Sequence, residues 1–387
     1  MKVFLIARGF PTARSPQWGC FERDQAEALV SVGNEVVVLS VDTRFRLFWR
    51  KPGISCHTDR GIHFVNCFLM PSSVVGLLGK SIRRKVEQWQ LRKVYEYASK
   101  RFGRPDILYS HYLFITANAV QLKQRYGVPL VAIEHWSELA KTNLPNSIIQ
   151  SVRQVYAQLD RLITVSPALQ QNIVEQTGQP SDVVYNVVGN DFQYNEKPRH
   201  RSRVRYITVG SLNNGKRFDV MLDALSNLNG VDGNWELVLI GEGTERTRLE
   251  SQVHRLGLDG QVRFLGRQTK SEIARQLLES DVFLLSSQME TFGVVCIEAM
   301  ACGLPIVATR CGGPESIVQE ADGLLCPIND ADAFFHALVF MQQNFLTYDR
   351  RNIAERCLQR FGAEVIGRQL SSIFLDVVQH STSSHSN

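Results

Sequence analysis

Short apolar runs alternate with amphipathic helical segments along most of the chain, and this rhythm limits the possible folds more than any other feature. A strand followed by a helix and another strand favours parallel sheets with helical crossovers. In the first half we expect strands at 3–7, 35–41, 107–110, 130–133 and 162–165, and helices at 21–32, 81–100 and 114–125. The sequence therefore predicts the α/β class.

The rhythm stops near Asn186 and restarts near Tyr206. The stretch 189–203 is polar, contains Pro and Arg and has no apolar period, which is typical of a linker. Beyond it we expect strands at 206–209, 236–240, 262–265, 282–285 and 305–308, and helices at 217–228, 244–256 and 294–301. A chain of 387 residues accommodates two such domains.

We therefore expect four segments. A doubly wound N-terminal domain spans 1–188, the linker 189–203 follows, and a doubly wound C-terminal domain spans 204–360. Residues 361–387 are expected to form a helix able to pack back on the N-terminal domain, followed by a disordered tail.

Composition indicates a globular protein, because 44% of the residues are hydrophobic and 21% are charged. No apolar run approaches the roughly 18 residues of a membrane span, and the run at 3–7 is too short for a signal peptide. The sequence thus predicts a cytoplasmic protein. None of the eight cysteines lies in a Cys-x-x-Cys pair, so we expect buried free thiols rather than disulfides or metal ligands.

The charge is unevenly distributed. Up to Asn190 there are 23 Lys and Arg against 14 Asp and Glu, and beyond it 20 against 24. Much of the positive charge lies from Arg44 to Lys51, among aromatic residues, and from Lys80 to Arg104, in an expected amphipathic helix. This pattern fits peripheral contact with the anionic inner face of the plasma membrane, and a solvated helix is the alternative. No nucleic acid is expected, because no nucleic-acid-binding module accompanies the charge.

Loops that follow strands are where a parallel sheet binds ligands. Gly19 precedes an expected helix, where N–H groups can approach an anion, although an ordinary turn glycine is the simpler interpretation. Lys216 and Arg217 lie at the start of another helix, and a Lys there can pair with a diphosphate. Gly241 and Gly243 either make a tight turn or leave room for a flat ring or phosphate.

The loop and helix from 286 to 305 carry the most specific pattern. Glu290 follows a strand, Gly293 opens a helix, and Glu298 lies within that helix among apolar neighbours. A carboxylate there is costly to bury without partners, and the vicinal hydroxyls of a ribose would satisfy it. N–H groups near Gly293 and Val294 face whatever the loop binds.

This segment resembles glycosyltransferase family 4, whose signature is two Glu separated by seven residues within Glu-x-Phe-Gly…Glu-Ala-Met-Ala-x-Gly-x-Pro. The resemblance implies the GT-B architecture, two Rossmann-like domains facing across a cleft. It implies a retaining, metal-independent transfer of a hexose-type sugar from a nucleoside diphosphate sugar, a UDP-sugar by family habit. The acceptor would be a hydroxyl of a lipid-linked or polysaccharide precursor, bound mainly by the N-terminal domain. No cofactor is expected, because the nucleotide-sugar is a substrate.

The resemblance also implies roles for single residues. Glu298 would bind the ribose, Glu290 the transferred sugar, and Lys216 the diphosphate, which Gly19 would approach from the other domain. Other donor contacts would come from backbone atoms at Phe292, Gly293, Val294, Gly241, Gly243, Phe264 and Leu265.

The N-terminal half offers His111 and His135, each at the end of an expected strand. Both resemble family positions where a His faces the donor sugar, and we expect His111 to lie nearer the reacting centre. His135 and its neighbour Glu134 are candidates for the acceptor or sugar side. A structural role is the alternative for a lone His.

Two residues depart from the family pattern at the expected phosphate site. Ser211 stands where many relatives have Arg, and Arg217 stands where Gly is common, so Arg217 is a candidate for the second cation.

Other interpretations are a GT-B nucleotide-sugar epimerase, a phosphorylase, for which no pyridoxal-bearing Lys is recognised, and a non-catalytic sugar-nucleotide-binding subunit. Asp330-Ala331-Asp332 matches an Asp-x-Asp metal motif but opens a helical run, where Asp is a good cap. We therefore predict no metal site.

Overall fold

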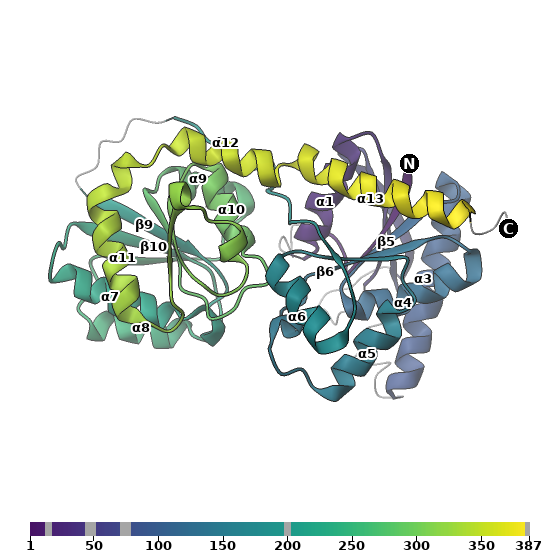
Figure 1. The fold of residues 1–387 in the computed structure, drawn as a ribbon, viewed down its shortest axis with the longest axis horizontal. Helices are drawn as coiled ribbons and strands as arrows, with labels where there is room; N and C mark the ends of the chain where they lie inside the picture. The colour runs from purple at the N-terminus through teal and green to yellow at the C-terminus, as the bar shows by residue number, and fades with distance from the viewer. Residues whose placement is uncertain (12–17, 43–51, 70–78, 197–202, 384–387) are drawn as a thin grey trace. The chain divides into compact units, whose positions relative to one another are not determined.

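The computed structural model describes residues 1–11, 18–42, 52–69, 79–196 and 203–383 (Figure 1). The chain forms two compact units. The N-terminal unit contains Met1–Val187 and Ala363–Asn387, and the C-terminal unit contains Val188–Gly362. Residues 197–202, within the expected linker, lie outside the described residues.

The N-terminal unit is built on an eight-stranded sheet of order β3-β4-β2-β1-β5-β6-β7-β8. Neighbouring strands are parallel except for the antiparallel pair β3 and β4. The strands are β1 (Lys2–Ala7), β2 (Glu35–Val41), β3 (Gly53–Asp59), β4 (Ile62–Phe68), β5 (Ile107–His111), β6 (Leu130–Glu134), β7 (Arg161–Thr164) and β8 (Asp182–Val183). The strand order reverses between β1 and β5, so the loops after these two strands diverge from a common point.

The helices of this unit alternate with its strands. They are α1 (Cys20–Ser31), α3 (Lys80–Phe102), α4 (Leu113–Tyr126), α5 (Asn146–Tyr156), α6 (Pro167–Thr177) and α13 (Ala363–Ser383), with the 3-10 turn η1 (Ser137–Ala140). The hairpin of β3 and β4 was not predicted, because β3 is a largely exposed edge strand with mixed polarity and no apolar run.

The C-terminal unit contains a parallel six-stranded sheet of order β11-β10-β9-β12-β13-β14. The strands are β9 (Val204–Val209), β10 (Trp235–Ile240), β11 (Val262–Gly266), β12 (Val282–Leu285), β13 (Ile306–Thr309) and β14 (Gly323–Cys326). This is the Rossmann order, in which the direction of strand succession reverses between the first and fourth strands, here β9 and β12.

Helices cover both faces of this sheet (Figure 1). They are α7 (Phe218–Asn229), α8 (Arg246–Arg255), α9 (Lys270–Leu278), α10 (Val294–Ala301), α11 (Ala331–Asn344) and α12 (Arg350–Phe361), with short 3-10 turns at 214–216, 314–316, 320–322 and 345–347. Side chains of α7, α8 and α11 form one core with alternate residues of the strands, such as Leu237 and Leu239. Helix α10 packs against α12 and α9.

The chain leaves the C-terminal unit at Gly362 and continues as α13, which packs against α1 in the N-terminal unit. Gly367 marks the closest approach, because a Cβ at that position would lie 2.2 Å from the carbonyl oxygen of Ala28. The helix extends through Ser383, and the end of the expected disordered tail, 384–387, lies outside the described residues.

Every strand and helix predicted above is present, with ends within two residues of the expected ones. The expected buried free thiols are confirmed in large part. All eight cysteines are free and six are buried, namely Cys67, Cys296, Cys302, Cys311, Cys326 and Cys357. Among the described residues, no helix combines the length and apolar character needed to cross a bilayer.

Candidate active site

The central feature of the C-terminal unit is a meeting of two loops at the switch point between β9 and β12. Lys216, in the loop after β9, places its Nζ 2.5 Å from Oε1 of Glu290, in the loop after β12. The hydroxyl of Ser287 donates to the same carboxylate oxygen at 2.6 Å. A Rossmann sheet binds its ligand at this point, so both charged groups lie where a ligand is expected.

Backbone contacts fix the two loops to each other. The amide of Gln288 donates to the carbonyl of Gly215 at 2.8 Å, and the Ser286 hydroxyl donates to the carbonyl of Lys216 at 2.9 Å. The Glu290 amide donates to the carbonyl of Cys311, which follows β13, at 2.8 Å. Three loop segments thus hold Glu290 in place before any ligand arrives.

Helix α10 begins directly after this loop. Gly293 precedes its first residue with φ 94°, a left-handed conformation that favours glycine. Phe292 is buried against Phe361, with ring centroids 5.7 Å apart, so only its backbone can face a ligand. Val294 and Glu298, both partly buried, lie on the same helix. The motif therefore places a helix N-terminus directly after the loop of Glu290 and a second carboxylate within that helix.

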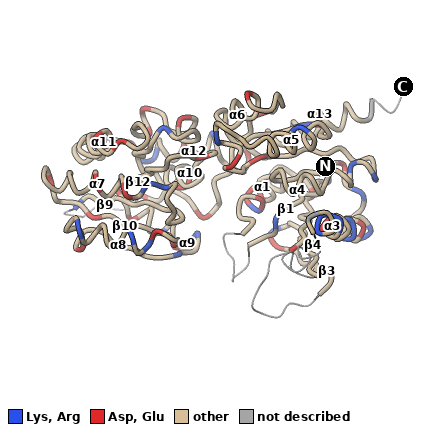
Figure 2. Tube along the Cα trace, turned by 90° about the horizontal axis from the view of Figure 1, so that it is seen from below, with Lys and Arg blue, Asp and Glu red and all other residues tan. Residues whose placement is uncertain are grey.

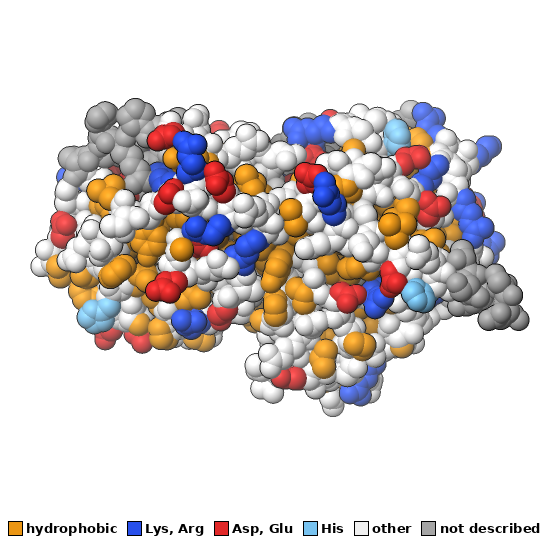
Figure 3. All heavy atoms as spheres, turned by 45° about the horizontal axis from the view of Figure 1, so that its top comes forward, with side chains coloured by type: hydrophobic (Ala, Val, Ile, Leu, Met, Phe, Trp, Pro, Cys, Tyr) orange, Lys and Arg blue, Asp and Glu red, His pale blue; other side chains and the backbone are white. Residues whose placement is uncertain are grey.

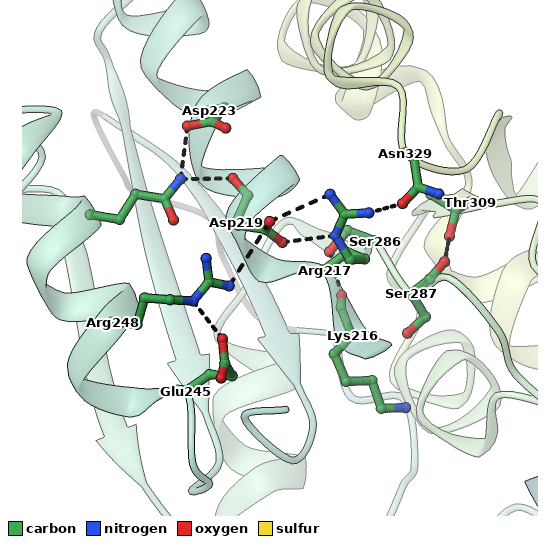
Figure 4. Close-up of polar contacts among 11 residues, drawn as sticks. Lys216, Arg217, Asp219, Asp223, Glu245, Arg248, Ser286, Ser287, Thr309 and Asn329 are labelled. Atoms are coloured by element: carbon green, nitrogen blue, oxygen red, sulfur yellow. Dashed lines mark hydrogen bonds and ion pairs between the residues drawn. The ribbon is translucent and has the colours of Figure 1, made fainter. Parts of the chain in front are cut away.

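Arg217 has partners other than those expected of a second phosphate-binding cation. Its guanidinium pairs with Asp219 at 3.1 Å and donates to Asn329. Figure 4 shows the side chains of Lys216 and Arg217 pointing apart. Arg217 also has φ 48°, the left-handed conformation that explains why glycine suits this position. Ser211 is exposed in the same loop.

The glycines after β10 are required by packing within the unit. A Cβ at Gly241 would lie 1.8 Å from the carbonyl oxygen of Gly210, and one at Gly243 would lie 2.2 Å from that of Leu212. The loop after β10 therefore packs directly on the backbone of the loop after β9. This packing requires glycine at both positions whether or not a ligand also approaches the loop.

Phe264 and Leu265 lie in β11 and are partly buried. The guanidinium carbon of Arg246 lies 4.8 Å from the centroid of the Phe264 ring. Arg246 was not identified from the sequence, because a helical Arg four residues from Glu250 is ordinary surface charge.

In the N-terminal unit the structure brings His111 and His135 together at the ends of β5 and β6. Nε2 of His135 lies 3.2 Å from Nδ1 of His111, and the rings stack with centroids 5.2 Å apart. Burial and, to a smaller extent, the nearby positive charge of Arg8 lower the pKa of His111 to about 3. Burial also lowers the pKa of His135. Both imidazoles are therefore neutral near pH 7.

Glu134 is fully buried and its carboxylate is occupied within the protein. One oxygen accepts from the amides of His135 and Trp136, at 2.8 and 2.7 Å, and the other accepts from the Leu113 amide at 2.8 Å and the Tyr156 hydroxyl. Burial raises the pKa of Glu134. These bonds indicate that Glu134 holds the turns after β5 and β6 and so positions the histidines.

Arg8, directly after β1, is a residue that the sequence reasoning missed. Its guanidinium pairs with the buried Glu22 at 2.9 Å and lies 4.0 Å from the centroid of the Tyr112 ring. Tyr112 follows His111 and has φ 65°. Gly19, at the start of α1, is buried, and a Cβ there would lie 2.3 Å from the carbonyl oxygen of Gly9. The signal in the sequence that could have identified Arg8 is its position as a cation at the end of the first parallel strand.

Asp330 caps helix α11, as expected, because its carboxylate accepts from the Ala333 amide at 2.9 Å. Within the described ranges, no group of three or more His, Cys, Asp or Glu side chains has an arrangement suited to a metal ion.

Two family models together match residues 23–351. The model described as Glycosyltransferase Family 4 matches 23–191, and the model described as Glycosyl transferases group 1 matches 190–351. The chain is 29% identical to the N-acetyl-alpha-D-glucosaminyl L-malate synthase of Bacillus anthracis, over 71% of this chain and 75% of that protein. It is 26% identical to the glycogen synthase of Mycobacterium tuberculosis, over 71% and 70% respectively.

Solved structures show the same fold. The sucrose-phosphate synthase of Thermosynechococcus elongatus superposes with a TM-score of 0.78 at 19% identity, over 98% of this chain and all of that one. Anabaena HepE, solved in complex with UDP and glucose, superposes with a TM-score of 0.72 at 18% identity, over 97% of this chain and all of that one. With its Glu290 to Glu298 motif at the switch point, the chain belongs to glycosyltransferase family 4 and is a glycosyltransferase of the GT-B fold.

Proposed function

We propose that this enzyme transfers a hexose-type sugar from a nucleoside diphosphate sugar to an acceptor hydroxyl, with retention of the anomeric configuration. The observation that carries the proposal is the pairing of Lys216 with Glu290 at the switch point of the C-terminal sheet. A cation and a carboxylate there suit the two halves of the donor, its diphosphate and its sugar. Glu298, on the helix that follows, suits the ribose hydroxyls.

During transfer, negative charge grows on the departing phosphate while positive charge grows on the sugar ring. Lys216 and the N-terminus of α10 would stabilise the leaving group electrostatically. Glu290 is held by Lys216 and Ser287, which suits a residue that positions the sugar hydroxyls. The acceptor's proton would pass to the leaving phosphate on the same face of the ring. Lys216 would supply the positive charge at the diphosphate, so we propose that no metal ion is required.

We propose uridine as the nucleobase. Anabaena HepE, which shares the fold, was solved in complex with UDP and with UDP-glucose, and this supports a uridine nucleotide. The base would lie near Phe264, beside the turn at Gly241 and Gly243, where mostly backbone atoms are available to it.

We propose a lipid-linked acceptor presented at the cytoplasmic face of an anionic membrane. Helix α3 supports this, because it exposes the apolar side chains of Ile82 and Trp89, 46% and 43% accessible, among basic ones. Figure 2 shows Lys and Arg gathered around α3, whereas Figure 3 shows acidic, basic and apolar side chains mixed over the C-terminal unit. An apolar and basic helix face suits anionic lipid headgroups. The stretch from Arg44 to Lys51 lies outside the described residues.

The direct test is a thermal-shift and calorimetric titration of the full chain with UDP, GDP and ADP, with and without EDTA. A ligand that binds the folded state raises its melting temperature with concentration. We expect UDP alone to bind tightly and EDTA to have no effect. Failure of all three nucleotides to bind would refute the donor site, and binding that EDTA abolishes would refute the metal-free mechanism.

Turnover separates the alternatives. Incubation with UDP-sugars and a lipid extract should yield an α-linked product by NMR when the donor is α-linked. A β-linked product would refute retention. Conversion of one UDP-sugar into its epimer without an acceptor would support an epimerase, and UDP binding without any turnover would support a non-catalytic subunit.

A further inference from the structure

A cavity of about 200 Å³ lies within the N-terminal unit, at the carboxyl ends of β1 and β2. Arg8 and Asp42 contribute from the strand ends, Arg83 and Glu87 from α3, and Asn118 from α4. Glu87 and Asn118 were not singled out in the sequence, and Arg83 was considered only as part of the basic stretch from Lys80 to Arg104. The cavity thus combines charged and amide side chains from two helices at the edge of the sheet where ligands bind.

One wall of the cavity is aromatic. Trp18 and Phe114 both line it, and Phe114 is 46% accessible. The indole N–H of Trp18 donates to the carbonyl of Arg8 at 3.1 Å, which fixes the plane of the ring. A fixed aromatic face packs well against the C–H groups of a flat or chair-shaped ring.

The polar side of the cavity is formed by three side chains that hydrogen-bond to one another, Arg83, Glu87 and Asn118. Nε of Arg83 donates to one oxygen of Glu87 at 2.9 Å, and the Asn118 amide donates to the other at 3.2 Å. A guanidinium has five N–H donors, a carboxylate oxygen accepts more than one hydrogen bond, and an amide offers both kinds of atom. The group can therefore pair with neighbouring hydroxyls, each of which both donates and accepts.

Arg8 links the cavity to the residue next to His111, the histidine expected to lie nearer the reacting centre. Arg8 lines the cavity and stacks on the ring of Tyr112 at 4.0 Å. Tyr112 is the residue after His111. A ring held in the cavity would thus lie near the groups that the N-terminal unit contributes to the reaction.

We propose that this cavity binds one polyhydroxylated ring of the acceptor, a sugar or a cyclitol, which presents the hydroxyl to be glycosylated. This inference rests on the proposed function. The volume is below the roughly 300–1,000 Å³ of pockets for drug-sized ligands, so it suits a single ring. A lipid chain offers no hydrogen-bond partner to the remaining donors and acceptors of Arg83, Glu87 and Asn118, whereas the hydroxyls of a ring do. The lipid part of the acceptor stays outside, along the exposed face of α3.

The test is saturation-transfer NMR on the full chain with four probes: methyl α-D-glucopyranoside, methyl α-D-mannopyranoside, myo-inositol and 1-octanol. At least one ring polyol should bind in the millimolar range. Arg83→Met and Asn118→Leu should each weaken that binding about tenfold, as expected for a lost hydrogen bond to a charged or amide group. Arg84→Met is the matched control, since Arg84 is the next exposed residue of α3 and does not line the cavity.

UDP titration of the same samples separates the two proposals. Preferential binding of octanol, absence of polyol binding, or polyol binding that neither variant weakens would overturn the cavity assignment. Polyol binding with the expected variant effects but no UDP binding would instead refute the proposed donor site. Arg83 is 49% accessible, so its replacement keeps the test valid even where Asn118→Leu impairs folding.

Discussion

Lys216 and Glu290, 74 positions apart in the chain, form an ion pair of 2.5 Å that bridges the loops after β9 and β12. Both side chains are partly accessible, at 26% and 13%, so the pair contributes little to stability and remains available to a ligand. The carboxylate keeps the ammonium at the switch point while no anion is bound. A diphosphate that arrives there meets a cation already in position.

Lys216→Met should reduce the preference of the enzyme for UDP over UMP. Because Lys216 would contact the diphosphate, its removal should weaken UDP binding about tenfold or more and leave UMP binding nearly unchanged. Calorimetric titration of both nucleotides measures the ratio. An equal loss for UDP and UMP would show that the substitution disturbs the whole site.

Glu298→Gln should remove the ability to distinguish UDP from 2′-deoxy-UDP. The carboxylate would accept from the ribose hydroxyls, and loss of a charged hydrogen bond weakens binding about 10- to 100-fold. Affinities for both nucleotides are measured on wild type and variant. Glu355→Gln, on an exposed position of α12, is the control and should leave both affinities unchanged. Retained discrimination in Glu298→Gln would exclude Glu298 from the ribose site.

Arg217→Gly should be more stable than Arg217→Ala by about 1 kcal/mol. Both variants lose the contacts with Asp219 and Asn329, but only glycine adopts φ 48° without steric cost. Melting temperatures compare the two. We expect both variants to bind UDP as wild type does, since the Arg217 guanidinium is engaged elsewhere. A large loss of UDP affinity in both would restore Arg217 as a phosphate ligand.

Acidification should destabilise the N-terminal unit through its buried histidines. The pKa of His111 is about 3 in the folded protein and 6.5 in a model peptide, so between these values the unfolded chain binds more protons. Stability therefore falls as the pH drops below about 6.5, by up to about 1.4 kcal/mol per pH unit for this group. In His111→Gln the melting temperature should fall less between pH 7 and pH 5. An unchanged slope would mean that His111 does not titrate on unfolding.

Charge reversal on α3 should weaken binding to anionic vesicles. Arg84 and Lys85 are exposed, so Arg84→Glu with Lys85→Glu should lower sedimentation with phosphatidylserine vesicles, since each basic residue contributes about 1 kcal/mol near such a surface. UDP affinity should not change. Vesicles of neutral lipid are the control, and equal binding to both lipid types would exclude an electrostatic contact.

The elements predicted from the sequence are ones with clear apolar patterns. The run from Val282 to Leu285 is buried throughout and coincides with β12. Strand β3 was not predicted because most of its side chains are exposed, and α9 and α12 were not predicted although each has buried residues at helical spacing. An exposed edge strand such as β3 has no apolar pattern that a sequence can reveal.

The loops that carry Lys216 and Glu290 could be predicted because each follows an apolar strand, and Glu298 lies in the helix that directly follows the second loop. The hydrogen bonds that Glu134 and Arg217 make within the protein could not be predicted. Several of them join segments far apart in the chain, as between Arg217 and Asn329. The hydrogen-bonded set of Arg83, Glu87 and Asn118 was not predicted for the same reason, because it joins side chains of two helices.

The crossing at Gly362 has a consequence for the order of assembly during synthesis. Residues 188–362 are topologically an insertion within the N-terminal unit, whose last helix, α13, emerges from the ribosome after them. The C-terminal unit can complete its core while the apolar surface of α1 still awaits α13. The half of the enzyme made first is thus the half that finishes folding last.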